Sequence, residues 1–183
     1  PVDVTGTNND NDSAGFTITG AVTTTSETGT TTNFDVVLTS QPTASVTVTV
    51  TGLDGTEGSL SAAVLTFTTS GAGAWNVPQT LTVTGVNDDL DDGNIGYVLT
   101  LAPGGADGTY AALAAQTISM TNQDDDAAAV TISESGGATI VHEIGTTDTY
   151  TIQLASQPLV SATVTVTPDS QVTVNGSASP VVL

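Results

Sequence analysis

The stretch FDVVLTSQPTASVTVTVT, residues 34–51, decides the fold class of this chain. Apolar and polar residues alternate on both sides of a Ser-Gln-Pro turn, and most of them are Val or Thr. These β-branched side chains suit a pleated, half-buried surface, and alternation with a period of two is typical of strands. The stretch therefore predicts two consecutive strands, at residues 33–39 and 45–51, and indicates an all-β protein.

The same stretch returns as YTIQLASQPLVSATVTVT from residue 150, at an offset of 116 residues (150 − 34 = 116). Three shorter matches keep nearly this spacing: TNNDNDSAGFTI with TNQDDDAAAVTI (121 − 7 = 114), SETG with HEIG (143 − 27 = 116), and SAAVL with SPVVL (183 − 65 = 118). Self-similarity at a constant period predicts a tandem repeat. We therefore expect the last strand of one copy over residues 1–12, a complete copy over residues 13–126, and the first half of a following copy over residues 127–183.

Strand patterns in the complete copy are separated by turn signals such as Ser40-Gln41-Pro42 and Asp54-Gly55. The alternation predicts strands at residues 15–18, 33–39, 45–51, 63–68, 79–86, 95–101 and 116–121. About seven short strands in a unit of this length predict an immunoglobulin-like Greek-key β-sandwich. In the following copy, the equivalent strands are expected at residues 128–132, 148–155 and 161–167.

The charge of the chain is one-sided: 19 Asp and Glu residues stand against no Lys or Arg, a formal net charge of −19. This excludes nucleic acid as a partner, because neutralising phosphates needs Lys and Arg, and it disfavours anionic membrane surfaces. No stretch is long and apolar enough for membrane insertion. The chain has no Cys and a single His, so thiolate zinc sites are excluded and groups for catalysis are few. We do not expect an enzyme.

The acidic residues gather in two clusters, NDDLDD at residues 87–92 and DDD at residues 124–126, both at the ends of expected strands. Because the chain has no Lys or Arg, a cation from outside must balance their charge. Ca²⁺, which takes roughly six to eight oxygen ligands, fits best. Loops at one end of a sandwich converge, so Glu27 and Asp54 are expected to join the clusters. The competing interpretation is that these are solvated Asp-rich turns.

The run WNVPQTLTVTGVNDDLDDGNIGYVLTL, residues 75–101, and the closing TNQDDDAAAVTI, residues 121–132, resemble the Calx-beta-type tandem repeats of large bacterial surface proteins. The resemblance covers the whole chain as one full and two partial copies. It implies a sandwich of about seven strands that binds Ca²⁺ at one end, near the junction with the next copy. The ligands that it implies are Glu27, Asp54, Asp88, Asp89, Asp91, Asp92, Asp124, Asp125 and Asp126.

Together these features predict a structural role: a calcium-binding spacer or stalk repeat of a secreted or cell-surface protein. Ca²⁺ at the junction would make neighbouring repeats of the same chain rigid. Two alternatives stay open. One is a subunit of an extracellular filament, sheath or surface layer, in which an identical subunit completes residues 127–183 by strand complementation. The other is an adhesion module that binds glycan or protein.

Several further residues are expected to have ordinary roles. Glu57 is expected to be a loop charge rather than a metal ligand. Trp75 is expected to pack over an edge of the core, as large aromatic side chains usually do. Surface charges are expected at Asp3, Asp35, Asp107, Glu134 and Asp148.

Overall fold

The computed structural model describes residues 3–20 and 22–182, which form two compact units. The first unit comprises the described residues up to Asp88 and those from Asp92 to Asp125. The second comprises Asp89 to Asp91 and the described residues from Asp126 onward. Strands dominate, which confirms the expected β-rich class. Within the described residues, no helix combines the length and the apolar character needed to cross a bilayer.

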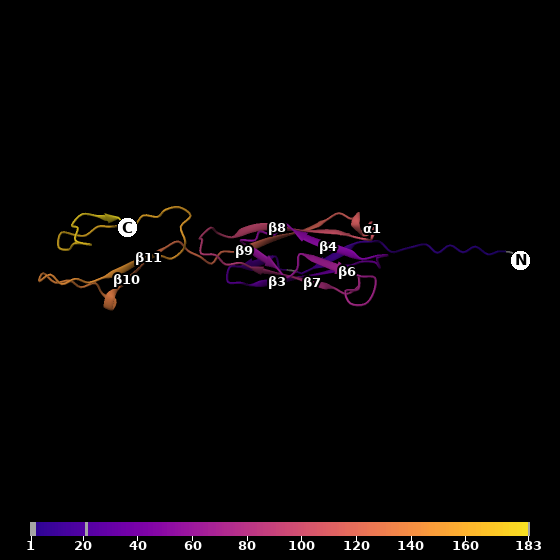
Figure 1. Ribbon diagram of the computed structural model, residues 1–183, viewed down its shortest axis with the longest axis horizontal. Helices are drawn as coiled ribbons and strands as arrows, with labels where there is room; N and C mark the ends of the chain where they lie inside the picture. The colour runs from indigo at the N-terminus through magenta and orange to yellow at the C-terminus, as the bar shows by residue number, and fades with distance from the viewer. Residues whose placement is uncertain (1–2, 21, 183) are drawn as a thin grey trace. The chain divides into compact units, whose positions relative to one another are not determined.

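Two sheets form the first unit (Figure 1). One is antiparallel and has four strands, in the order β1 (Phe16–Thr19), β3 (Thr31–Leu38), β7 (Gln79–Gly85) and β5 (Gly58–Leu60). The other has five, in the order β2 (Thr24–Ser26), β9 (Gln116–Gln123), β8 (Ile95–Gly105), β4 (Val46–Thr51) and β6 (Val64–Phe67). Strand β2 runs parallel to β9, and the other pairs in this sheet are antiparallel.

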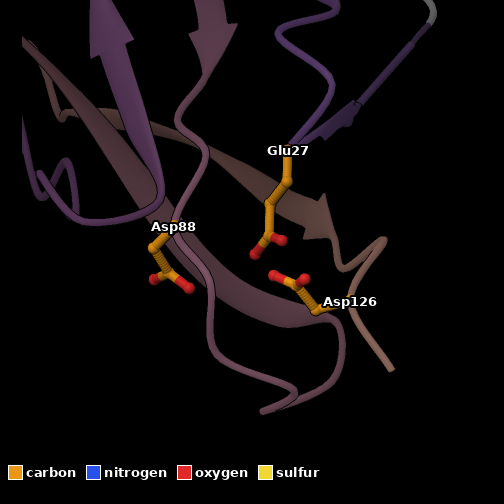
Figure 2. A group of neighbouring side chains, drawn as sticks. All are labelled: Glu27, Asp88 and Asp126. Carbon is orange, nitrogen blue, oxygen red and sulfur yellow. The ribbon is translucent and has the colours of Figure 1, made fainter. Parts of the chain in front are cut away.

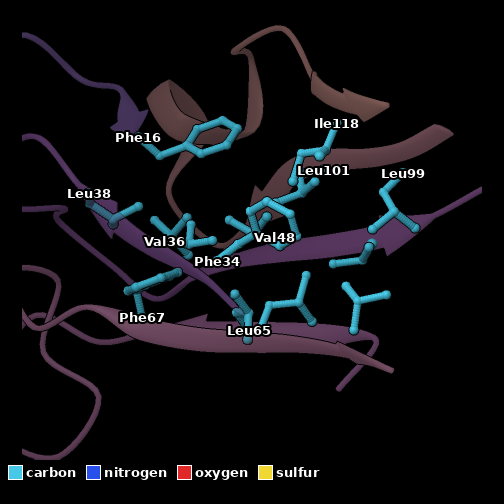
Figure 3. Close-up of a cluster of buried hydrophobic side chains, with 14 of the residues drawn as sticks. Phe16, Phe34, Val36, Leu38, Val48, Leu65, Phe67, Leu99, Leu101 and Ile118 are labelled. Atoms are coloured by element: carbon cyan, nitrogen blue, oxygen red, sulfur yellow. The ribbon is translucent and has the colours of Figure 1, made fainter. Parts of the chain in front are cut away.

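Both sheets contribute to one hydrophobic core (Figure 3). Its residues alternate along the strands, as the period-two pattern predicts: Val46, Val48 and Val50 on β4, and Phe34, Val36 and Leu38 on β3. A fully buried side chain of this kind contributes about 1.5–3 kcal/mol. The alternation that indicates the fold class therefore also supplies its packing energy.

Each strand expected in the first unit is present, with ends that differ by a few residues. Strands β2 and β5, each three residues long, go beyond the expected set. Three residues cannot display a period of two, so only pairing with the longer β9 and β7 identifies these strands. Trp75 is partly buried against the hydrophobic core, as expected.

The short helix α1 (Gly108–Ala111) corrects one prediction, because its N-cap Asp107 is only 4 % exposed and is not a surface charge. The Asp107 carboxylate accepts hydrogen bonds from the backbone N–H groups of Thr43, Thr109 and Tyr110 and from the Thr43 hydroxyl, at 2.7–3.2 Å. The bond from the Thr43 backbone contributes most to lowering the pKa of Asp107 to about 2. A single helical turn leaves no periodic pattern, so the helix cap could not be predicted from the sequence.

Asp107→Asn is expected to weaken the fold near neutral pH and to lose this effect in acid. The carboxyl has a pKa of 3.8 when unfolded and about 2 when folded. Ionised Asp107 therefore stabilises the native state above the unfolded pKa, and this stabilisation disappears as the pH falls toward the folded pKa. Melting temperatures of the wild type and the variant should converge between about pH 5 and about pH 2. Asp3→Asn removes an exposed charge as a control, and a constant gap would contradict the assignment.

The second unit contains β10 (Val130–Glu134), η1 (Ser135–Gly137), β11 (Tyr150–Leu154), β12 (Thr165–Val166) and β13 (Val181–Val182). Strands β10 and β11 are antiparallel, and Val130 is opposite Leu154. The corresponding pair in the first unit is Phe16 opposite Leu38, between β1 and β3. The offsets are 114 (130 − 16) and 116 (154 − 38), which are spacings of the sequence repeat.

The second strand pair of this unit also corresponds to a pair in the first unit. Thr165 is opposite Val182 across β12 and β13, as Thr49 is opposite Val64 across β4 and β6. The offsets here are 116 (165 − 49) and 118 (182 − 64). Residues 3–15 form no strand. Residues 1, 2 and 183 of the expected partial copies lie outside the described part of the chain.

Candidate metal centre

Glu27, directly after β2, is the most deeply buried acidic side chain among the described residues, with 3 % of its surface exposed. The parallel pairing of β2 with β9 continues into a hydrogen bond from the Glu27 backbone N–H to the Gln123 carbonyl, at 3.0 Å. The Asp125 backbone N–H hydrogen-bonds the Glu27 carboxylate. Atom Oε2 of Glu27, however, is buried and has no hydrogen-bond partner. A buried carboxylate oxygen in this state is costly, and a bound cation would satisfy it.

The surroundings of Glu27 oppose its ionisation. Burial is the largest cause of its raised pKa, and the negative charges of Asp124, Asp88 and Asp125 raise the pKa further. The hydrogen bond from the Asp125 backbone acts in the opposite direction but does not outweigh them. A bound cation would reverse this balance, because it attracts the charged form of every carboxylate around it.

Two further carboxylates lie beside Glu27. One ligand oxygen from each of Glu27, Asp88 and Asp126 lies within 4.8 Å of the other two. Figure 2 shows the carboxylates of Glu27 and Asp126 facing each other, with Asp88 beside them. Two oxygens that share one Ca²⁺ at about 2.3–2.6 Å can be at most about 5.2 Å apart. The spacing of this first group therefore fits a single ion.

A second group shares Asp88 with the first. Its ligand oxygens come from Glu57, Asp88 and Asp92, and they also lie within 4.8 Å of one another. Glu57, in the turn before β5, is 5 % exposed, so it is buried rather than an ordinary solvated loop charge. The Val86 backbone N–H donates to the Glu57 carbonyl at 3.1 Å, which ties the turn before β5 to the loop that carries Asp88. Asp88 is thus common to two groups of carboxylates.

Asp54, a predicted ligand, lies outside both groups. It is exposed, and its Oδ1 accepts hydrogen bonds from the backbone N–H and the hydroxyl of Thr56, at 3.1 and 2.7 Å. The hydroxyl bond is the larger cause of a lowered pKa for Asp54. Asp54 therefore closes the turn that presents Glu57, the neighbouring acid that the sequence analysis did not select.

The other predicted ligands also make contacts of their own. Oδ2 of Asp124 accepts a hydrogen bond from the Gly93 backbone N–H at 2.7 Å. Oδ2 of Asp91 accepts one from the Ala128 backbone N–H, also at 2.7 Å. The side chains of Asp89 and Asp125 are exposed. None of these four carboxylates belongs to either ligand group.

The chemistry of the two groups suits a hard cation. Every candidate ligand atom is a carboxylate oxygen, a donor type that suits Mg²⁺, Ca²⁺ and Mn²⁺. The sequence contains no Lys or Arg that could neutralise these groups. Ca²⁺ accepts irregular sets of carboxylates and carbonyls, whereas Mg²⁺ keeps several waters and a strict octahedron. The residues that the structure brings together therefore fit Ca²⁺.

Comparison with known proteins shows distant structural likenesses. No protein family and no curated protein matched the sequence. Among solved structures, the chain is similar to SSP-19, an MSP-domain protein like family member in Caenorhabditis elegans, with 10% identity and a TM-score of 0.36 over 55% of this chain and 90% of that one. It is also similar to WR4, a C. elegans MSP family member, with 13% identity and a TM-score of 0.36 over 58% of this chain and 95% of that one. Likenesses at this level carry no argument about function.

Proposed function

We propose that the chain is a calcium-binding structural spacer from a secreted or cell-surface protein. The observation that carries this proposal is Glu27: a deeply buried carboxylate whose Oε2 has no hydrogen-bond partner and which is grouped with two other carboxylates. A cation at this position satisfies the orphaned oxygen and removes the repulsion at the same time.

The two groups support two Ca²⁺ ions bridged by Asp88. Five carboxylates make up the groups: Glu27, Glu57, Asp88, Asp92 and Asp126. Their combined charge of −5 when ionised is nearly balanced by the +4 of two Ca²⁺ ions. Backbone carbonyls and water would complete the roughly six to eight oxygen ligands of each ion. The protein supplies the anionic oxygens, and the ions supply the positive charge that its sequence lacks.

The spacer role further requires repeated domains. The equal register of the strand pairs in the two units supports a tandem array of immunoglobulin-like Greek-key sandwiches. So does the resemblance of residues 75–101 to Calx-beta-type repeats. Asp126 ends the expected complete copy, residues 13–126, so ion binding would order the segment that leads into the next copy. The partners in this proposal are neighbouring repeats, and no catalytic activity is assigned.

A subunit of an extracellular filament or layer is the second candidate. Three apolar side chains of the second unit favour it by their exposure: Ile132 at 63%, Leu159 at 73% and Val160 at 79%. Assembly by strand complementation would cover such residues. Sedimentation of the chain with Ca²⁺ distinguishes the candidates, since a spacer stays monomeric whereas a subunit forms particles whose size grows with concentration.

Calcium is expected to stabilise the chain in a melting experiment, and Glu27→Gln should reverse part of the effect. Thermal melts in excess EGTA and in millimolar Ca²⁺ are compared. The free energy of unfolding should be higher with Ca²⁺ by about 2.7 kcal/mol when the ion is at 100 times its dissociation constant. Because burial and neighbouring charges raise the pKa of Glu27, its stabilising contribution is lost as the pH rises through the folded pKa. Glu27→Gln should therefore melt higher than the wild type in EGTA at neutral pH, and gain less from Ca²⁺.

Asp3→Asn is the control for the loss of one exposed negative charge, and Mg²⁺ at the same concentration is the control for ionic strength. Neither control should combine a higher melting temperature in EGTA with a smaller gain from Ca²⁺, as Glu27→Gln should. If the wild type shows no calcium-dependent melting shift and calorimetry detects no binding, the acidic residues are solvated turns and the proposed function is wrong.

A further inference from the structure

Asn122 on β9 is a buried polar side chain that contacts the second ligand group without belonging to it. Only 1 % of its surface is exposed. Its Nδ2 donates hydrogen bonds to the Val86 carbonyl at 3.0 Å and to Oε2 of Glu57 at 3.4 Å. Its Oδ1 accepts one from the Thr25 hydroxyl, at 3.0 Å. One amide therefore connects β2, β9, the loop after β7 and a candidate ligand.

The partners of Asn122 determine how its amide is oriented. A backbone carbonyl can only accept hydrogen bonds, so the NH₂ group must face Val86, and from there it also reaches the Glu57 carboxylate. The Thr25 hydroxyl can then donate to the amide oxygen. Turning the amide over would break both bonds of the NH₂ group and place its oxygen against the Glu57 carboxylate. Asn122 is thus held in one orientation by a fully connected buried network.

This orientation matters for two ligands at once. The bond to Glu57 restrains the carboxylate that belongs to the second group. The bond to Val86 restrains the residue two positions before Asp88, at the start of the loop between β7 and β8. An Asp at position 122 would have the same shape but would bring a negative charge against Glu57. The site therefore requires a neutral donor here. Asn8 occupies the repeat-equivalent position (122 − 8 = 114), two residues before Asp10.

We infer that Asn122 is a positioning residue for the ion held by Glu57, Asp88 and Asp92, and that it acts through Glu57. This inference rests on the proposed function and extends it. The amide of Asn122 presents its nitrogen, which is a donor and not a cation ligand, to Glu57, while its oxygen accepts the bond from Thr25, so we assign it to orienting the ligand. Partners of this kind, which orient metal ligands, typically change metal affinity by about 10- to 100-fold when they are replaced.

The test is calorimetric titration of the full chain with CaCl₂. Asn122→Leu keeps the branched shape of the side chain but removes all three hydrogen bonds. It is expected to weaken one of two binding events by about 10- to 100-fold while the Glu27 group keeps its affinity. Thr25→Val is the matched control: it removes one bond of the same buried network but leaves the Asn122–Glu57 bond intact. It should lower the melting temperature in EGTA without a selective loss of one ion.

A double-variant cycle tests whether Asn122 acts through Glu57. In a Glu57→Gln background, Asn122→Leu should change calcium affinity by less than about twofold, because the ligand that it positions is already altered. An unchanged effect in both backgrounds would overturn the inference. If Asn122→Leu does not fold cooperatively, Asn122→Asp retains the bond to Thr25 and is expected to lose the same ion.

The outcomes separate this inference from the function on which it rests. Two binding events in both the wild type and Asn122→Leu, with equal affinities, would overturn the positioning role and leave the calcium site standing. Absence of calcium binding in the wild type would overturn both. An equal loss of calcium affinity in Asn122→Leu and Thr25→Val would show that Asn122 only stabilises the fold.

Discussion

Asp88→Asn is expected to weaken both of the proposed calcium-binding events by a large factor. Asp88 is the residue common to the two candidate ligand groups, so its replacement would remove one anionic ligand from each proposed ion. Replacing residues that only orient ligands typically costs about 10- to 100-fold in affinity. A shared ligand should cost more, so we expect at least about 100-fold at each site, or roughly 2.8 kcal/mol. Calorimetric titration and the melting shift between EGTA and Ca²⁺ measure this loss.

Asp89→Asn is the matched control for that experiment. It lies next to Asp88 in the same loop and removes the same charge, but its exposed side chain belongs to neither ligand group. We expect it to keep both binding events within a few-fold. Equal losses in the two variants would mean that the loop attracts Ca²⁺ by its total charge, and the bridging role of Asp88 would then be wrong.

Gly85→Ala is expected to cost about 3 kcal/mol of stability. A Cβ at Gly85 would lie 2.2 Å from the Ser26 carbonyl oxygen and 2.7 Å from Oδ1 of Asn122. The first of these atoms is backbone, so β2 or β7 must move to make room. Both strands adjoin the residues that carry the candidate ligands, and calcium affinity should fall together with stability.

Chemical denaturation in EGTA measures the effect of Gly85→Ala directly. Gly55→Ala provides the control, because a Cβ there has nothing within 4 Å. Its effect should stay within about 0.5 kcal/mol, as is usual for surface substitutions. If Gly85→Ala is as stable as the wild type, then β2 and β7 do not approach each other as closely as described.

The fold was largely predictable because its information is local. Alternation over residues 34–51 indicates strands on its own, and the same alternation separates buried Val48 from exposed Thr49 on β4. Strands β2 and β5 could not be predicted from pattern, because three residues do not establish a period. Asp107 escaped prediction for a related reason: its role as a buried cap depends on Thr43, which is 64 positions away.

The sequence predicted that the candidate site consists of carboxylates, but it did not predict which acidic residues belong to it. Glu27 and Asp88 follow from residue type and from their places near strand ends. Glu57 does not, because its burial depends on the approach of Val86 and on the amide of Asn122. Asp54 has the same residue type and a similar loop position, yet its side chain bonds Thr56 in its own turn.

The sequence by itself determined that this chain is rich in β-strands, that it contains matching stretches about 116 residues apart, and that it has no Lys or Arg to balance its carboxylates. These properties follow from the periodicity and the composition of the sequence, and they can be read without knowing which distant residues are in contact. Only the tertiary structure decided which acids gather around Asp88, and that Glu27 is buried with an oxygen that has no partner. The physical reason is that the grouping of the carboxylates depends on how strand ends and loops from two sheets come together. A side chain's direction there is set by neighbours that are remote in the chain.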